Sequence, residues 1–204
     1  MKSKILTLII SGLLLVGSNA WGRQPAQQPS LSTATFAAGC FWCVQEAFDK
    51  APGVVKVIVG FTGGHLANPT YRQVSRENTG HYEAVEVKFD PRKISYQQLL
   101  QVFWRNSDPT DAGGQFCDRG PSYRTAIFYH NERQKRLATQ SKAQLVASNK
   151  LEKVVTPILP AGKFYPADES HQDYYKKNPF RYKFYKSRCG RVERLNKVWG
   201  DEKN

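Results

Sequence analysis

Residues 81–90, HYEAVEVKFD, alternate apolar and polar side chains over most of their length, which is the pattern of a β-strand with one buried face. Successive side chains of a strand point to opposite faces. Val85, Val87 and Phe89 therefore share the apolar face with Glu83, whereas Glu86 lies on the other face. The pattern places the Glu83 carboxyl at the start of the strand on its apolar face. The alternative is an ordinary strand-end carboxylate paired with an arginine.

Strands and helices alternate irregularly along the rest of the chain. The strands expected are 34–38, 54–61, 123–129 and 153–159, and the helices are 40–50, 96–106 and 132–149, with Ser95 and Asn131 as N-caps. Pro157 places the last strand at a sheet edge. This mixture predicts an α+β fold, a two-layer sandwich of a mixed or antiparallel sheet with flanking helices and long loops. Residues from Pro179 onward show little periodicity, and we expect an irregular C-terminal tail.

The N-terminal residues have the composition of a secretory signal peptide. Lys2 and Lys4 precede an apolar run over residues 5–16, and the small residues of Ser18-Asn19-Ala20 follow it. The run is too short to span a membrane, although an uncleaved tethering helix is the alternative. We therefore expect a signal peptide at 1–20, a Gln-, Pro- and Ser-rich linker at 21–33, a folded domain at 34–204, and export to the periplasm or the medium.

The chain is basic, with 30 Lys and Arg against 17 Asp and Glu. Its basic residues are scattered, which favours solubility and weak attraction to anionic surfaces over specific binding of nucleic acid. The length of 204 residues suits one well-buried domain, which we expect to be a monomer.

The four cysteines are Cys40, Cys43, Cys117 and Cys189. An even number in an exported protein suggests disulfides, and one possible function is a basic extracellular binding module held by them. A zinc site is disfavoured because only Cys40 and Cys43 form a CxxC pair, and the four histidines have no metal-ligand spacing. We expect no metal.

Cys40 has the position of a reactive thiol. It follows a predicted strand and Gly39 and opens a predicted helix, where the unpaired N–H groups favour the thiolate. Cys43 lies one turn further in, where this effect fades. The CxxC spacing also allows a thioredoxin-like dithiol exchanger, but Phe41 and Trp42 between the cysteines would crowd a protein partner.

Five segments in order resemble the A-type peptide methionine sulfoxide reductase family: GCFWC, GFTGGHLANPTY, GHYEAVEVKFDP, SDPT and YRTAIFY. The resemblance covers residues 34–199. It implies a nucleophile, two aromatic residues for the substrate methyl group, an acid, two tyrosines for the sulfoxide oxygen and a loop aspartate. These are, in that order, Cys40, Phe41 and Trp42, Glu83, Tyr71 and Tyr123, and Asp118.

The resemblance also implies the reaction. A thiol enzyme of this family reduces methionine-S-sulfoxide, protein-bound and free, through a cysteine sulfenic acid and an intramolecular disulfide, and so repairs oxidised proteins. It needs no bound cofactor, but depends on an external dithiol such as a thioredoxin-like protein. A burial-raised pKa would suit Glu83 to donate a proton.

The sequence offers three candidates for the resolving cysteine. Family members commonly carry it in the C-terminal tail, which points to Cys189, while Cys43 is expected to be held within its helix. Cys117 stands where many relatives have asparagine, and either a redox role or a small buried thiol fits it. PSYR around Tyr123 also replaces a more usual Thr-Gln-Tyr-Arg.

Overall fold

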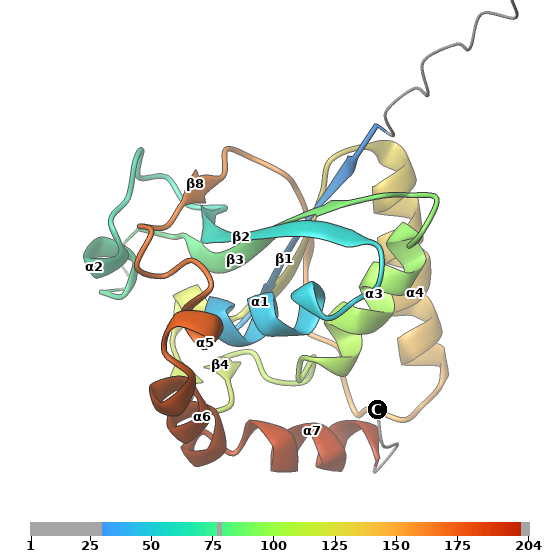
Figure 1. The fold of residues 1–204 in the computed structure, drawn as a ribbon. Coiled ribbons are helices and arrows are strands. Elements are labelled where there is room, and N and C mark those ends of the chain that lie inside the picture. The colour runs from blue at the N-terminus through green and yellow to red at the C-terminus, as the bar shows by residue number, and fades with distance from the viewer. Residues whose placement is uncertain (1–29, 77–78, 201–204) are drawn as a thin grey trace, which may run out of the picture.

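The strand expected at residues 81–90 is β3, Tyr82–Phe89, and it lies inside a six-stranded sheet. The computed structural model describes residues 30–76 and 79–200 (Figure 1), and the sheet order is β7-β6-β1-β3-β2-β8. β3 pairs antiparallel with β1, Ser32–Ala38, and with β2, Val54–Thr62. The outer strands are β6, Thr125–Tyr129; β7, Ile158–Pro160; and β8, Tyr165–Pro166. β7 runs parallel to β6, so the expected mixed sheet is confirmed.

The N-terminal boundary of the sheet differs slightly from expectation. The expected signal peptide, residues 1–20, lies outside the described residues, as does most of the linker expected at 21–33. Ser32 and Thr33 instead begin β1, where they pair with Phe89 and Lys88. In the described part of the chain, no helix has both the length and the apolar character needed to cross a membrane.

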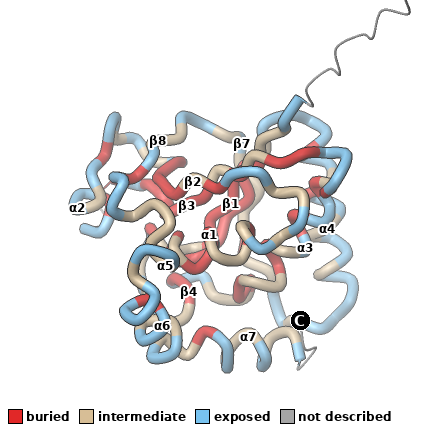
Figure 2. The backbone as a smooth tube through the Cα atoms, in the orientation of Figure 1, coloured by how far each residue is buried: buried red, intermediate tan, exposed pale blue. Residues whose placement is uncertain are grey.

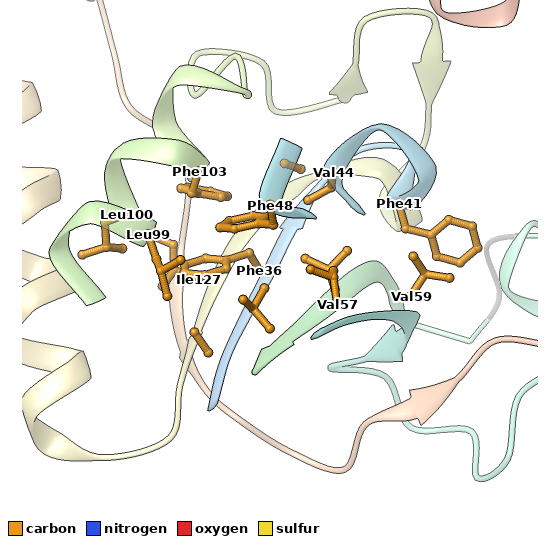
Figure 3. Packing of buried hydrophobic residues seen from close by; sticks show 14 of the residues in the cluster. Phe36, Phe41, Val44, Phe48, Val57, Val59, Leu99, Leu100, Phe103 and Ile127 are labelled. Atoms are coloured by element: carbon orange, nitrogen blue, oxygen red, sulfur yellow. The ribbon is translucent and has the colours of Figure 1, made fainter. Parts of the chain in front are cut away.

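The main core lies between the sheet and three helices, α1 (Phe41–Asp49), α3 (Tyr96–Arg105) and α4 (Glu132–Ala147). Phe36 of β1 stacks on Phe48 and Phe103, with ring centroids 5.0 and 5.4 Å apart (Figure 3). Such aromatic pairs add about 0.5–1.5 kcal/mol each beyond the area they bury. The central strands are the most buried part of the backbone (Figure 2), so β1 and β3 are held firmly within the core.

The expected helix caps are present. The side chain of Ser95 accepts the Gln98 N–H at the start of α3, and the side chain of Asn131 accepts the Gln134 N–H at the start of α4. Between the large elements lie short ones: α2, Tyr71–Val74; β4, Gly114–Gln115; β5, Asp118–Arg119; a 3-10 turn, Pro121–Tyr123; and α5, Tyr174–Lys177.

The C-terminal tail is not irregular, as expected from the sequence, but forms two helices. These are α6, Pro179–Arg188, and α7, Arg191–Trp199, which lie below α1 and α3 in Figure 1. Only Tyr182 of α6 and Arg191 of α7 are buried. α6 buries so few side chains that it carries no apolar periodicity, whereas Leu195, Val198 and Trp199 of α7 recur at helical spacing, a pattern that does predict a helix and that the expectation of an irregular tail overlooks.

Gly39 fixes the turn that joins β1 to α1. Its φ of +81° lies in the left-handed region, and a Cβ at this position would come within 2.5 Å of the Gln115 Cβ. An L-residue there would be both strained and in collision with a buried side chain.

We therefore expect Gly39→Ala to reduce the free energy of unfolding by at least about 1–2 kcal/mol, measured by urea denaturation. Gly162→Ala is the matched control, because a Cβ there would meet nothing within 4 Å. Equal stability of the two variants would contradict this account of the turn.

Candidate active site

Cys40 is the N-cap residue of α1, directly after the Gly39 turn. Its carbonyl accepts the N–H groups of Cys43 and Val44, and its side chain is only 6% exposed. The first N–H of the helix, that of Phe41, has no partner within α1. It donates instead to Glu83 Oε2 at 3.0 Å. One hydrogen bond thus joins the acid on β3 to the residue beside the Cys40 thiol.

Glu83 lies on the buried face of β3, as its position in the strand pattern predicts, and it is 2% exposed. Burial raises the pKa of its carboxyl to about 8, the Phe41 N–H opposes that shift, and the nearby charge of Asp118 adds to it. Within the described part of the chain Glu83 forms no ion pair, so the alternative of an arginine-paired carboxylate is wrong. Glu83 is therefore mainly protonated at neutral pH.

The two thiols of the CxxC pair have opposite pKa shifts. Burial raises the pKa of Cys40 well above its usual value, and Cys43 and Glu83 raise it further. This reverses the shift expected from the helix N-terminus, because removal from water outweighs the helix dipole here. A hydrogen bond from Cys40 lowers the pKa of Cys43 to about 6, with help from the positive charge of Arg191. The negative charge of the resting pair therefore lies on Cys43.

Aromatic side chains surround this pair. Trp42 stacks on Tyr174 with ring centroids 3.9 Å apart, and Tyr71 lies 4.3 Å from His171. The Phe41 ring centroid lies 6.2 Å from the ring centroids of both Trp42 and Tyr71. Of these residues, the sequence predicts Phe41, Trp42 and Tyr71. His171 and Tyr174 have no distinguishing spacing in HQDYY and are brought here only by the fold of the segment before α5.

Tyr71 and Tyr123 converge on Glu83 from α2 and the 3-10 turn. Burial raises the pKa of Tyr71 to about 12, with Glu83 the next cause, while a hydrogen bond with Tyr123 opposes the shift. The pKa of Tyr123 is also raised by burial and then by Glu83. Both hydroxyls therefore stay protonated and can donate hydrogen bonds beside the acid.

α6 covers the other side of the Cys40 thiol. Tyr185 meets Trp42 edge-on, and its hydroxyl donates to Asp118 Oδ2. Burial raises the pKa of Tyr185, and the neighbouring Cys40 sulfur is the next cause. Tyr185 thus lies between Cys40 and Asp118. Asp118 is a site residue that the sequence predicts, whereas Tyr185 is not.

Cys189, the C-cap of α6, is not a free thiol in the structure. It forms a disulfide with Cys117, with Cα atoms 4.9 Å apart, whereas Cys40 and Cys43 are both free. Its Sγ lies 3.8 Å from Asp118 Oδ2. Cys117, Asp118 and Cys189 have the spacing of a metal-ligand group, but the two sulfurs are bonded to each other rather than available to an ion.

The site therefore combines a buried thiol, a neutral carboxylic acid and two tyrosine hydroxyls within an aromatic shell. Such an arrangement can bind an apolar group against the rings while a polar atom of the same ligand receives a proton. It can also transfer the oxidation from one cysteine sulfur to another by thiol–disulfide exchange.

Comparison with known proteins points to one family. Residues 32–203 match the family model described as peptide methionine sulfoxide reductase. The chain is 54% identical to the peptide methionine sulfoxide reductase MsrA of Bacillus licheniformis, over 82% of this chain and 93% of that protein. It resembles the structure of methionine sulfoxide reductase A of Corynebacterium diphtheriae, with TM-score 0.66 and 35% identity over 75% of this chain and 77% of that one. The fold is shared with Mxr1 of Saccharomyces cerevisiae in complex with Trx2, with TM-score 0.50 and 23% identity over 71% and 84% of the two chains.

The raised pKa of Glu83 has a consequence for stability. Between about pH 4.5 and pH 8 this carboxyl ionises in the unfolded chain but stays protonated in the folded one, so stability falls as pH rises. We expect the wild type to lose up to about 3 kcal/mol relative to Glu83→Gln between pH 5 and pH 8, measured by urea denaturation. Glu86→Gln, on the other face of β3, is the matched control and should show no such trend. A pH-independent difference between the wild type and Glu83→Gln would show that the carboxyl ionises normally.

Proposed function

The chain belongs to the A-type peptide methionine sulfoxide reductase family, and we propose that Cys40 and Glu83 carry its reduction of methionine-S-sulfoxide to methionine. The enzyme is a thiol-dependent oxidoreductase that repairs oxidised proteins. One observation carries the assignment of residues: the neutral Glu83 carboxyl accepts a hydrogen bond from the N–H of Phe41, the residue after Cys40.

The substrate fits the site because its sulfur carries one apolar and one polar group. Its S-methyl group is apolar and suits the rings of Phe41 and Trp42, while its sulfoxide oxygen is a strong acceptor. Glu83, Tyr71 and Tyr123 are the donors for that oxygen. With both groups fixed, only one epimer presents its sulfur to Cys40, which accounts for selectivity toward the S form.

In the first step the Cys40 sulfur attacks the substrate sulfur while Glu83 gives a proton to the oxygen. The protonated oxygen then moves to the Cys40 sulfur as the substrate S–O bond and the transient bond between the two sulfurs break, so methionine leaves as a thioether and Cys40 becomes a sulfenic acid. The proton lost by the Cys40 thiol restores the Glu83 carboxylic acid. General-acid assistance of this kind contributes about 10²–10⁴-fold to a rate. Because burial raises the pKa of Cys40, its thiol gives up its proton as the substrate binds rather than beforehand.

Cys43, rather than Cys189, resolves the sulfenic acid in our proposal. Its thiol lies against Cys40, with which it shares a hydrogen bond, and its pKa is lowered to about 6. Cys189 is bonded to Cys117 in the structure. Attack of the Cys43 thiolate on the Cys40 sulfur forms an S–S bond, and the hydroxyl leaves as water after taking a proton.

An external dithiol closes the cycle. The structure of Mxr1 with Trx2 supports a thioredoxin-like protein in this role, as the chemistry requires two electrons and two protons for each sulfoxide reduced. No bound cofactor takes part in any of these steps.

The proposal is tested by a single-turnover assay with a methionine-sulfoxide peptide and prereduced enzyme. We expect Cys40→Ser to release no methionine. Cys43→Ser should release it in the first turnover, but its sulfenic acid, trapped by dimedone, should outlast that of the wild type at least tenfold. A dithiol exchanger would release no methionine at all, and release by Cys40→Ser would refute the mechanism. Formation of the disulfide at the wild-type rate in Cys43→Ser would instead refute only the assignment of Cys43.

We also propose that the enzyme works outside the cytoplasm. The support is in the sequence alone: Lys2 and Lys4, the apolar run at 5–16, and small residues at Ser18 and Ala20. Expression in a bacterial host followed by fractionation should yield a periplasmic or secreted protein whose N-terminus lies near residue 21. Full-length protein confined to the cytoplasmic fraction would contradict this. A variant with Lys2 and Lys4 changed to Glu should be retained in the cytoplasm.

A further inference from the structure

The four cysteines form two pairs in opposite redox states and opposite environments. Cys40 and Cys43 are free and buried, whereas Cys117 and Cys189 are bonded to each other. Cys117 is exposed and Cys189 is partly exposed. A protein reductant must bring its own thiolate to a disulfide sulfur. It can reach the outer pair on the surface, but the inner pair lies beneath Trp42 and Tyr185.

Side chains connect the two pairs. Tyr185 contacts the Cys40 sulfur and donates its hydroxyl proton to Asp118, and Asp118 Oδ2 lies 3.8 Å from Cys189 Sγ. Cys189 follows Tyr185 by one helical turn, and its N–H donates to the Tyr185 carbonyl. A movement that withdraws Tyr185 from Cys40 therefore also moves Cys189. Gly190, with φ +64° and open space around it, separates α6 from α7 and allows such a movement.

We propose that Cys117 and Cys189 are a second redox-active pair that takes the oxidation from the buried pair and presents it to the external dithiol, with Cys117 as the terminal thiol. This inference rests on the proposed function. It gives Cys117 a catalytic role, and a bonded outer pair beside a free inner pair is the arrangement that such a transfer would leave.

The exchange balances as two thiol–disulfide steps. The Cys189 thiolate attacks Cys40 in the Cys40–Cys43 disulfide, forming a Cys40–Cys189 bond and releasing Cys43 as a thiolate. The Cys117 thiolate then attacks Cys189, forming the Cys117–Cys189 bond and releasing Cys40, which takes up a proton. The external dithiol finally reduces the outer pair and is itself oxidised to a disulfide.

The surroundings of Cys43, the thiolate that leaves in the first step, favour transfer of the oxidation from the inner pair to the outer pair. Arg191 lies near Cys43 and stabilises the thiolate released in the first step, and a thiolate of low pKa leaves faster. Arg191 also stacks over Phe116, the residue before Cys117, at 4.4 Å. The same guanidinium from α7 therefore acts electrostatically on Cys43 and contacts the loop that carries the terminal thiol.

A purely structural disulfide is the competing explanation, and stoichiometry separates the two. Fully reduced enzyme is mixed with excess methionine-sulfoxide peptide and no reductant, and the methionine released per enzyme is counted. If the outer pair takes the oxidation from the inner pair, which we call the relay, Cys40 is regenerated once and can reduce a second sulfoxide. We therefore expect two methionines per enzyme from the wild type and one from Cys117→Ser or Cys189→Ser. With one equivalent of substrate, peptide mass mapping should place the wild-type disulfide at Cys117–Cys189.

Recycling by a thioredoxin-like protein gives a second measurement. We expect Cys117→Ser to recycle at least tenfold more slowly than the wild type, while its first turnover is unchanged. Ser187→Ala, an exposed change on the same helix, is the matched control and should behave as the wild type. Thermal unfolding of each reduced variant verifies that it is folded.

The relay is overturned if the wild type releases only one methionine and its disulfide remains between Cys40 and Cys43, or if Cys117→Ser recycles normally. Either result leaves the reductase function intact. A wild type that releases no methionine would instead refute the proposed function itself.

Discussion

The hydrogen bond from the Phe41 N–H to the buried Glu83 carboxyl is the interaction on which the site depends. It joins the first turn of α1 to the start of β3, so it fixes the distance between the thiol and the acid. It also satisfies an N–H that the helix cannot use. The carboxyl can remain protonated at neutral pH only because the sheet and α1 exclude water from it, so the fold itself sets the proton donor's strength.

A second constraint is the separation of charge across the CxxC pair. Burial and the neighbouring Cys43 raise the pKa of Cys40, and the carboxyls of Glu83 and Asp118 raise it further. The hydrogen bond from Cys40 lowers the pKa of Cys43, and the positive charges of Arg191 and Lys186 lower it further. Both cations come from the C-terminal helices, which bury few side chains of their own. Those helices therefore supply charges that influence the reactivity of Cys43, and α6 covers the buried pair.

The parts of the site that sequence predicts are those set by local pattern. Alternation in β3 places Glu83 on the buried face, and the strand, glycine and helix order places Cys40 at a helix start. Features that depend on distant contacts do not follow from pattern: helix α6, the position of His171 and the Cys117–Cys189 bond. The raised pKa of Cys40 is of the same kind, because burial by the whole fold outweighs the local helix dipole that the sequence reveals.

The central claim is that a neutral Glu83 donates the proton in the first chemical step. The most direct test is the pH dependence of the single-turnover rate of methionine formation, compared between the wild type and Glu83→Gln. The account predicts a wild-type rate that falls as pH rises through about 8, as the carboxyl ionises, and a much slower variant without that decline. A wild-type rate that stays level or rises through this range, or a variant with the same decline, would contradict it.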